Sequence, residues 1–384
     1  MLHRMSIFTF HNPTKIIFGR DSISKLGEET SKLGKKCLLV SGRSFARRSG
    51  YLDAIERNLS ASGLMITIFN EVEPNPSIET LYGGATAAKK GECDVVVAFG
   101  GGSAIDAAKG IAFLASGDVK LEESFAPNEV LRPILPIVAI PTTCGTGSEA
   151  TRYSVITDVT ARKKRTLFGL PLLPKLALLD PAFLDNLSKQ MVAYTGFDAL
   201  SHSFEALLSK SSNRISDILA IESITTICQN LVDAHGGSLE SREQVLFGSL
   251  LGGMAINTTG TVIVHGMGYY LTNYHGIHHG LANSVLLLHV LRFEGDHVRD
   301  KLQRIIVNLG LRDIPSLFDS VESLADKVGI PRSLADLGIK ATELDLMVSD
   351  AMSYARNIDN NPVKVSNEEM KEIYSRALSG KRTG

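Results

Sequence analysis

Two stretches in the second half of the chain hold side chains of the types that bind metal ions. In the first, Asp198 and His202 are four residues apart, and apolar residues recur around them with helical spacing. At about 3.6 residues per turn, the two side chains project from one face of a helix, one turn apart. A carboxylate and an imidazole placed in this way can share a metal ion. An ordinary pair on a helix surface is the commoner interpretation of these two residues alone.

The second stretch, residues 265–280, is rich in histidine. It holds four of the ten histidines of the chain: His265, His275, His278 and His279. On one continuous helix, His265 and His279 would lie about 21 Å apart along the axis, too far for one ion. A turn within residues 272–276 would let them meet, and Gly276 supplies a plausible break. On composition alone, other histidines compete for this role: His275, His278 and His289.

Together these residues offer the ligands of a single ion. One carboxylate and three neutral imidazoles would leave an octahedral ion with open positions for a substrate oxygen. The four cysteines do not add a second metal site, because they are widely spaced and form no C-x-x-C motif. Cys144 has no histidine near it in the sequence, so we interpret it as a loop residue rather than a nucleophile.

Two junctions in the first half, where an apolar strand runs into glycines and hydroxyl residues, are typical of nucleotide binding. The first is the run 94–99 followed by three glycines at 100–102, after which Ser103 and Asp106 form a predicted capping box. The second follows the apolar run 134–140. Glycines let a pyrophosphate approach the backbone, and N–H groups at a helix start attract its charge. An open α/β sheet binds its ligand at such loops, so we predict a nucleotide site, with structural turns as the alternative.

The elements that must position these residues change character along the chain. Strands and helices alternate up to Asp185, which predicts a parallel sheet covered on both faces. Residues 7–18 are predicted to form two short strands, and the basic run 162–165 a solvated hairpin or loop. We therefore predict an α/β domain over residues 1–185 and an all-helical domain over residues 186–384. The helices predicted in the second domain include 188–193, 197–209, 217–234, 242–257 and 282–293.

Composition narrows the functional class. The chain has 384 residues, with 40 basic and 41 acidic side chains, so its charge gives no reason to expect nucleic acid or an anionic membrane as a partner. Its apolar runs are too short to span a bilayer, and the start of the chain lacks the long apolar segment of a signal peptide. We expect a cytoplasmic globular protein.

Four motifs resemble those of the iron-containing (group III) alcohol dehydrogenases, in the same order and over essentially the whole chain. They are Gly100-Gly-Gly-Ser103-x-x-Asp106, Pro141-Thr-Thr-x-Gly-Thr-x-Ser-Glu149, Thr195-Gly-x-Asp198-Ala-Leu-x-His202 and His265-Gly with His279-Gly280. The resemblance implies a dinucleotide-binding α/β domain, a helical domain, a site in the cleft between them, and a homodimer. It also implies Fe²⁺, or Zn²⁺ as in some relatives, held by residues matched here by Asp198, His202, His265 and His279. His275 and His278 then become neighbours of the site.

The chain departs from the family pattern at two positions. Many members carry a histidine near the nicotinamide where this chain has Tyr269, and a phenol is a poor proton acceptor near neutral pH. Relatives that prefer NAD carry an aspartate where this chain has Gly42, which is followed by Arg43. Loss of that carboxylate removes repulsion of a 2′-phosphate, and an arginine can pair with it. We therefore predict that NADP(H) is preferred over NAD(H).

We predict a metal-dependent alcohol dehydrogenase, or aldehyde reductase, acting reversibly on a small primary alcohol or diol with NAD(P). The predicted catalytic residues are His265, His279 and Tyr269. The predicted cofactor-binding residues are Gly42, Arg43, Gly100, Gly101, Gly102, Ser103, Asp106, Thr142, Thr143, Thr146, Ser148, Thr151 and Lys164. The alternatives are a glycerol-type polyol dehydrogenase, a lyase resembling dehydroquinate synthase, and a nucleotide- and metal-binding sensor without turnover.

Overall fold

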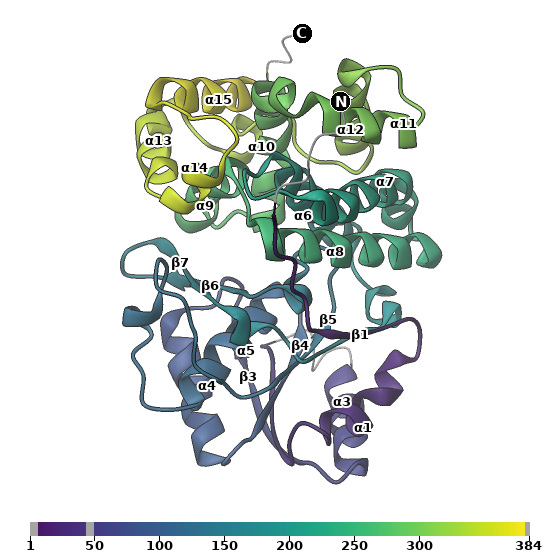
Figure 1. Ribbon diagram of the computed structural model, residues 1–384, viewed down its shortest axis with the longest axis vertical. Coiled ribbons are helices and arrows are strands. Elements are labelled where there is room, and N and C mark those ends of the chain that lie inside the picture. Colours follow the sequence, from purple (N-terminus) through teal and green to yellow (C-terminus); the bar gives the residue numbers. More distant parts are fainter. Residues whose placement is uncertain (1–6, 44–49, 381–384) are drawn as a thin grey trace.

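A six-stranded parallel sheet forms the centre of the first half of the molecule (Figure 1). The computed structural model describes residues 7–43 and 50–380. The strands are β1 (Lys15–Phe18), β2 (Lys36–Gly42), β3 (Met65–Val72), β4 (Val95–Gly100), β5 (Ile137–Pro141) and β8 (Leu176–Leu179), in the order β1-β8-β5-β4-β2-β3. The central strands β4 and β5 are buried along their whole length, which explains why they read as continuous apolar runs.

Helices cover both faces of this sheet, as predicted. Two helices, α1 (Leu26–Thr30) and α3 (Tyr51–Ala61), cover one face and pack against Leu39 of β2. Two others, α4 (Ile78–Lys90) and α5 (Gly102–Ala115), cover the opposite face and pack against Leu38 and Val40 of the same strand. Successive residues of a strand therefore enter different cores, as the two-residue period of a strand requires. A separate antiparallel pair, β6 (Tyr153–Asp158) and β7 (Lys163–Phe168), lies beside α5 at the end of the sheet domain nearer the helices (Figure 1).

The second half of the described chain is helical, also as predicted. Its α-helices are α6 (Lys189–Leu208), α7 (Arg214–Gly236), α8 (Leu239–Thr259), α9 (Ile263–His275), α10 (His279–Glu294), α11 (Arg299–Asn308), α12 (Ile314–Lys327), α13 (Leu344–Met352), α14 (Ala355–Asn360) and α15 (Asn367–Ser379). Short 3₁₀ helices connect elements in both halves: Ser22–Lys25, Glu122–Ser124, Ser148–Ala150, Leu170–Leu172, Pro181–Leu184, Gly295–Val298, Ala335–Leu337 and Ala341–Glu343. We propose a domain boundary near residue 185, between β8 and α6.

Two local predictions were wrong, and a third holds in part. Only residues 15–18 of the segment 7–18 form a strand; ahead of it, Asn12 donates a side-chain hydrogen bond to the Ala150 carbonyl instead of joining the sheet. The two helices predicted over 188–209 are one helix, α6. Gly196 does not end it, because this glycine allows close packing: a Cβ there would lie 2.4 Å from a methyl group of Leu231 on α7. The hairpin predicted for the basic run 162–165 is confirmed, because β6 and β7 pair antiparallel and residues 163–165 begin β7. Lys164 alone departs from the prediction, since it is buried rather than solvated.

Within the part of the chain that the structure describes, one helix, α7, is long and apolar enough to cross a membrane by length and composition alone, and α8 with α9 would pass the same test as a bent pair. The buried face of α7 packs against α6 and α8 within the helical core. The core helix of a folded domain meets the same criteria, so this composition is weak support for a membrane span.

Candidate active site

Three metal-ligand side chains converge on the helical side of the cavity between the sheet and the helices. Asp198 and His202 lie one turn apart on α6, and His265 lies in the first turn of α9. One ligand atom from each of the three lies within 4.8 Å of the other two, and all three residues are buried. The Nε2 atoms of His202 and His265 are 2.9 Å apart. The fold thus brings together residues that are separated in the sequence by two whole helices, α7 and α8, and α10 packs against both α6 and α9.

His279, the first residue of α10, adjoins this group from another side. The chain turns at Gly276, whose φ of 65° is left-handed, so α9 ends before α10 begins. The His279 Nε2 atom is 3.9 Å from Asp198 Oδ1, and its ring centroid is 5.0 Å from that of His265. His279 therefore faces the same centre but lies outside the compact set of three.

The competing histidines lie outside the compact set of three, although His278 lines the same cavity. His275 Nε2 lies 2.6 Å from the Glu343 carboxylate, outside the cluster. His278 packs on the ring of Tyr194, with 5.4 Å between ring centroids, and its Nδ1 accepts a hydrogen bond from the Gly280 amide. His289 is buried further along α10, and it does not belong to the cluster.

The sequence analysis missed Glu205, which lies fully buried on the same face of α6. Its Oε2 atom contacts Nδ1 of His265, while Oε1 accepts hydrogen bonds from the amides of Val262 (2.9 Å) and His265 (3.2 Å). A carboxylate in this position fixes the Nδ1–H tautomer of His265 and turns Nε2 toward the cluster. The signal was present in the spacing, because Glu205 follows Asp198 by seven residues and His202 by three, on one helical face.

The electrostatics of the cluster suit a divalent cation. His202 also directs Nε2 inward, because its Nδ1 lies 3.2 Å from the Gly145 carbonyl. Burial lowers the pKa of His202, and it lowers that of His279 to about 3. Burial also opposes charge on Asp198 and His265. The surrounding histidines nevertheless hold the pKa of Asp198 below its ordinary value, and Glu205 raises that of His265. An anionic carboxylate facing inward-directed imidazole nitrogens is a donor set that Fe²⁺ or Zn²⁺ accepts.

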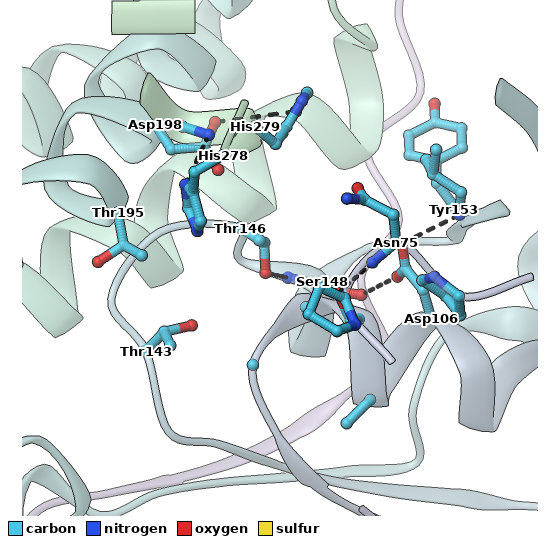
Figure 2. A pocket seen from close by; sticks show the side chains of 18 of the residues that line it. Asn75, Asp106, Thr143, Thr146, Ser148, Tyr153, Thr195, Asp198, His278 and His279 are labelled. Atoms are coloured by element: carbon cyan, nitrogen blue, oxygen red, sulfur yellow. Dashed lines mark hydrogen bonds and ion pairs between the residues drawn. The ribbon is translucent and has the colours of Figure 1, made fainter. Parts of the chain in front are cut away.

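Across a cleft from this cluster lie the two glycine-rich loops. The first follows β4 and the second follows β5; these neighbouring strands bring them together, and the Thr142 amide donates to the Gly100 carbonyl (3.1 Å). A Cβ at Gly102 would lie 2.5 Å from Thr146, so a larger residue would force the loops apart. Figure 2 shows Thr143, Thr146 and Ser148 of the second loop below Asp198 and His279.

The predicted capping box at Ser103 and Asp106 does not form. The cap position is Gly101, without a side-chain bond, and Ser103 Oγ instead accepts from the Asn75 amide (3.2 Å). The Asp106 carboxylate reaches across to the second loop, where it accepts from the hydroxyl of Ser148 at 2.6 Å (Figure 2). A tertiary contact has replaced the local one, and it ties the two loops to each other.

A buried lysine reinforces this tie. Lys109 Nζ donates to the carbonyl and hydroxyl of Ser148 (both 2.8 Å), to the hydroxyl of Thr151 (3.2 Å) and to the carbonyl of Tyr153 (2.6 Å). Burial lowers the pKa of Lys109 to about 8. The side chains of Ser148 and Thr151 are therefore held by Lys109, which makes them parts of the loop's internal framework.

Two cationic residues predicted to bind the cofactor are also placed by the fold. Lys164 Nζ donates to Asn75 Oδ1 (2.8 Å) and to the hydroxyl of Thr157 (2.9 Å), and burial lowers its pKa to about 8. Arg43, at the end of β2, donates from Nε to the Glu71 carbonyl (2.9 Å). Its side chain is otherwise exposed.

Tyr269 stacks on the imidazole of His279, with 5.9 Å between the ring centroids and 16° between the planes. Its edge meets the ring of Tyr354 at 4.8 Å. Burial raises the pKa of Tyr269 well above its ordinary value. The phenol of Tyr269 therefore stays protonated near neutral pH, which leaves almost none of the phenolate form that could accept a proton.

All of the predicted site residues line one cavity of about 660 Å³ between the sheet and the helices. The four predicted metal ligands and Tyr269 lie on its helical side. The predicted cofactor residues lie on the other, from Gly42 and Arg43 through both glycine-rich loops to Lys164. The fold and the site together define a protein in which nucleotide-type loops of a parallel sheet face a buried cluster of metal-ligand residues carried by helices.

Comparison with known proteins identifies the family. A model described as "Iron-containing alcohol dehydrogenase" matches residues 13–181, and one described as "Fe-containing alcohol dehydrogenase family, C-terminal" matches residues 192–378. The chain is 35% identical to a 1,3-propanediol dehydrogenase of Citrobacter freundii, over 98% of this chain and 100% of that protein. It is 31% identical to an NADPH-dependent butanol dehydrogenase of Clostridium saccharobutylicum, over 95% and 96% of the two chains.

A solved structure of a 1,3-propanediol oxidoreductase superimposes with a TM-score of 0.93 at 33% identity, covering 97% of this chain and 100% of that one. The protein belongs to the iron-containing alcohol dehydrogenase family. It is an oxidoreductase of that family, which implies iron and a nicotinamide dinucleotide.

Proposed function

We propose that this protein transfers a hydride reversibly between a small primary alcohol or diol and NADP, with Fe²⁺ as its metal and Zn²⁺ as a substitute. In the reducing direction, an aldehyde, NADPH and a proton give the alcohol and NADP⁺. The observation that carries the proposal is the shared cavity, which sets a cluster of metal-ligand residues opposite two glycine-rich loops.

The residues of the chain have separate tasks in this proposal. Asp198, His202, His265 and His279 hold the metal, and Glu205 keeps His265 in the orientation for binding. When bound, the metal supplies Lewis-acid chemistry at the substrate oxygen. The loops at 100–103 and 142–148 hold the pyrophosphate and the nicotinamide end of the cofactor against it.

Tyr269 has a packing role in this proposal. It stacks on His279 and lines the cavity, but its pKa is raised by burial, so it does not take up a proton near neutral pH. We propose that it shapes the substrate side of the cavity and limits the movement of His279. The proton is exchanged elsewhere, through groups or water that reach the cavity.

Reconstitution tests the reaction. Metal-stripped protein should oxidise NADPH in the presence of short aldehydes once Fe²⁺ is added without oxygen, or Zn²⁺ is added. His265→Ala should lose metal and turnover while it retains NADPH binding. Turnover without metal in His265→Ala would show that the metal assignment is wrong. NADPH binding without turnover for any metal and aldehyde would favour a lyase or a sensor on this fold.

The preference for NADP(H) rests on the end of β2. Gly42 and Arg43 line the cavity, and Arg43 is 3.8 Å from the carboxylate of Glu73, close enough to exchange that partner for a 2′-phosphate. We expect a higher kcat/KM with NADPH than with NADH, and a reversal of the preference in Gly42→Asp. A clear preference of the unmodified protein for NADH would contradict this proposal.

We also propose a cytoplasmic homodimer with no nucleic-acid or membrane partner. The β1 strand at the edge of the sheet is partly exposed, which leaves it open to a second copy. Sedimentation equilibrium of the full chain tests this assembly, and a monomer at micromolar concentration would contradict it.

A further inference from the structure

We propose that the substrate carries an oxyanion group, such as a carboxylate, at the end remote from the reacting carbon, and that Arg356 binds this group. The inference rests on the proposed function and deepens it, because it names the chemical class of the aldehyde or alcohol. Arg356 lies near the start of α14 and lines the cavity between the two halves of the molecule.

The guanidinium group of Arg356 lies on a platform of two aromatic rings. Its Cζ atom is 4.3 Å from the ring centroid of Tyr153 on β6 and 5.1 Å from that of Phe168 on β7. Stacking of this kind fixes the plane of the guanidinium and leaves its N–H groups directed outward from its edge. A rigid, planar fork is the geometry that binds a carboxylate with two hydrogen bonds.

The charge of Arg356 has no counterion among residues 7–43 and 50–380. Arg356 is exposed, and within these described ranges its side chain forms no ion pair and no hydrogen bond; its partners are the two rings. The other cations on the cavity wall differ, because Lys164 is held by Asn75 and Thr157, and Arg43 by the Glu71 carbonyl. The carboxylates of the wall are also engaged: Asp106 with Ser148, Asp198 with Asn283. Arg356 is thus the free cation of the described cavity wall.

The position of Arg356 fits the remote end of a short substrate. Tyr269 connects the two ends, because it stacks on the predicted metal ligand His279 and meets the ring of Tyr354, two residues before Arg356 in the sequence, and both Tyr269 and Arg356 line the cavity. Apolar and aromatic residues of the cavity wall include Val155, Ile256 and Tyr153. A substrate whose oxygen lies at the metal cluster would extend along this wall toward the guanidinium.

A structural role is the rival interpretation. The rings of Tyr153 and Phe168 belong to the sheet domain and Arg356 to the helical domain, so the stack can also join the two domains. Such a joint would support turnover of all aldehydes alike, whereas a binding role discriminates between charged and neutral ones. The ratio of two kcat/KM values therefore separates the interpretations.

The experiment uses metal-loaded full-length enzyme with NADPH and three aldehydes of matched length: 4-oxobutanoate, its methyl ester, and butanal. We expect the unmodified enzyme to prefer 4-oxobutanoate over either neutral aldehyde by about tenfold or more. Arg356→Met should lower kcat/KM for 4-oxobutanoate about 10- to 100-fold further than it lowers that for butanal. Arg356→Lys should restore part of the difference, because it keeps the charge but loses the fork.

Arg162→Met is a matched control. Arg162 also lies over an aromatic ring, that of Tyr274 at 5.6 Å, but it does not line the cavity. This variant should leave the ratio between charged and neutral aldehydes unchanged. Thermal shift with butanoate against 1-butanol, in the presence of NADP⁺, gives a second readout that does not need turnover.

The outcomes are distinguishable. Two results would overturn the inference and leave the proposed reaction standing. One is a preference of the unmodified enzyme for the neutral aldehydes, and the other is an equal loss of kcat/KM for all three aldehydes in Arg356→Met. Stabilisation by butanoate that is absent in Arg356→Met would support it. Failure to reduce any aldehyde would instead count against the proposed function itself.

Discussion

At the scale of single residues, the carboxylate of Glu205 brings together several groups that the sequence keeps apart. It lies against the amides of Val262 and His265 and against the ring of His265, at the point where α9 begins. It therefore determines both where this helix starts and how its first imidazole is oriented. A buried carboxylate with these partners would act on a metal bound at His265 through that imidazole rather than by touching the ion.

Replacement of Glu205 should therefore weaken metal binding without affecting the nucleotide loops. We expect Glu205→Gln to lower metal affinity about 10- to 100-fold. Metal content after dialysis against graded chelator measures this effect, and NADPH fluorescence titration should give an unchanged Kd. The control is Glu343→Gln, which alters a second Glu–His pair, with His275, outside the cluster. Wild-type metal affinity in Glu205→Gln would disprove the positioning role.

A second buried carboxyl, Glu294, predicts a dependence of stability on pH. It is fully buried at the end of α10, where the Asn361 amide donates to Oε1 and Oε2 has no partner, and burial raises its pKa to about 8. Between these two pKa values, Glu294 is therefore protonated in the folded protein, whereas in the unfolded chain it loses its proton above the ordinary pKa of about 4.5. Stability from this group is present at low pH and is lost as the pH rises toward 8, by up to about 1.4 kcal/mol per pH unit.

Glu294→Gln should consequently flatten the decline in the free energy of unfolding between pH 6 and pH 8. Urea unfolding at both pH values measures this difference. Glu240→Gln alters an exposed carboxylate on α8 and serves as the control. Its free energy of unfolding should decline in parallel with that of the unmodified protein. If the slopes for Glu294→Gln and the unmodified protein are equal, the carboxyl is not protonated in the folded state.

At the scale of elements, two glycines set how closely the second nucleotide loop approaches α8. Gly147 has a left-handed φ of 58°, and a Cβ built on it would lie 2.5 Å from Cα of Gly253. A Cβ on Gly253 would in turn lie 2.5 Å from the Gly147 carbonyl oxygen. The contacting atoms on both sides are backbone, so they cannot rotate away. The loop of the sheet domain is thus seated directly on a helix of the other domain.

Gly253→Ala should push the loop away from α8, although alanine favours a helix more than glycine does. We expect a loss of about 1–3 kcal/mol in the free energy of unfolding, as in overpacked cores, together with a higher KM for the dinucleotide. Gly236→Ala is the control, because this helical glycine on α7 has open space around it and should gain stability. A Gly253→Ala variant as stable as the unmodified protein would contradict the close contact.

At the scale of the whole molecule, the two halves of the site come from different domains. The predicted metal ligands are carried by α6, α9 and α10, whereas the nucleotide loops follow β4 and β5. Metal removal should therefore loosen the packing between three helices and leave the sheet edge intact. This separation predicts that the two ligands can be removed independently.

Chelation should lower the melting temperature and abolish turnover while NADPH still binds. A metal present at about a thousand times its Kd stabilises the folded state by about 4 kcal/mol, so its loss is readily seen by calorimetry. Titration of the chelated protein with NADPH should give a Kd within a fewfold of that for the loaded protein. Loss of NADPH binding on chelation would show that the cleft depends on the metal for its shape.

The sequence alone determined the features that depend on local spacing. Periods of two and about 3.6 residues predicted the βα alternation and the shared face of Asp198 and His202. The glycine-rich junctions at 100–102 and 142–148 are visible as local runs of residues. A residue's neighbours within one or two turns decide these patterns, so they can be read without the fold. Motif order then indicated the family, which supplied the choice of His265 and His279.

Only the tertiary structure decided which groups meet across long separations. In the folded chain, His275 contacts Glu343, and Glu205 contacts His265. Asp106 binds Ser148 rather than capping its own helix, and Arg356 lines the cavity. Each of these contacts spans dozens of residues, and its geometry depends on how whole helices pack. The local pattern around such residues is the same whether or not the distant partner is present, and for this reason the sequence could not reveal them.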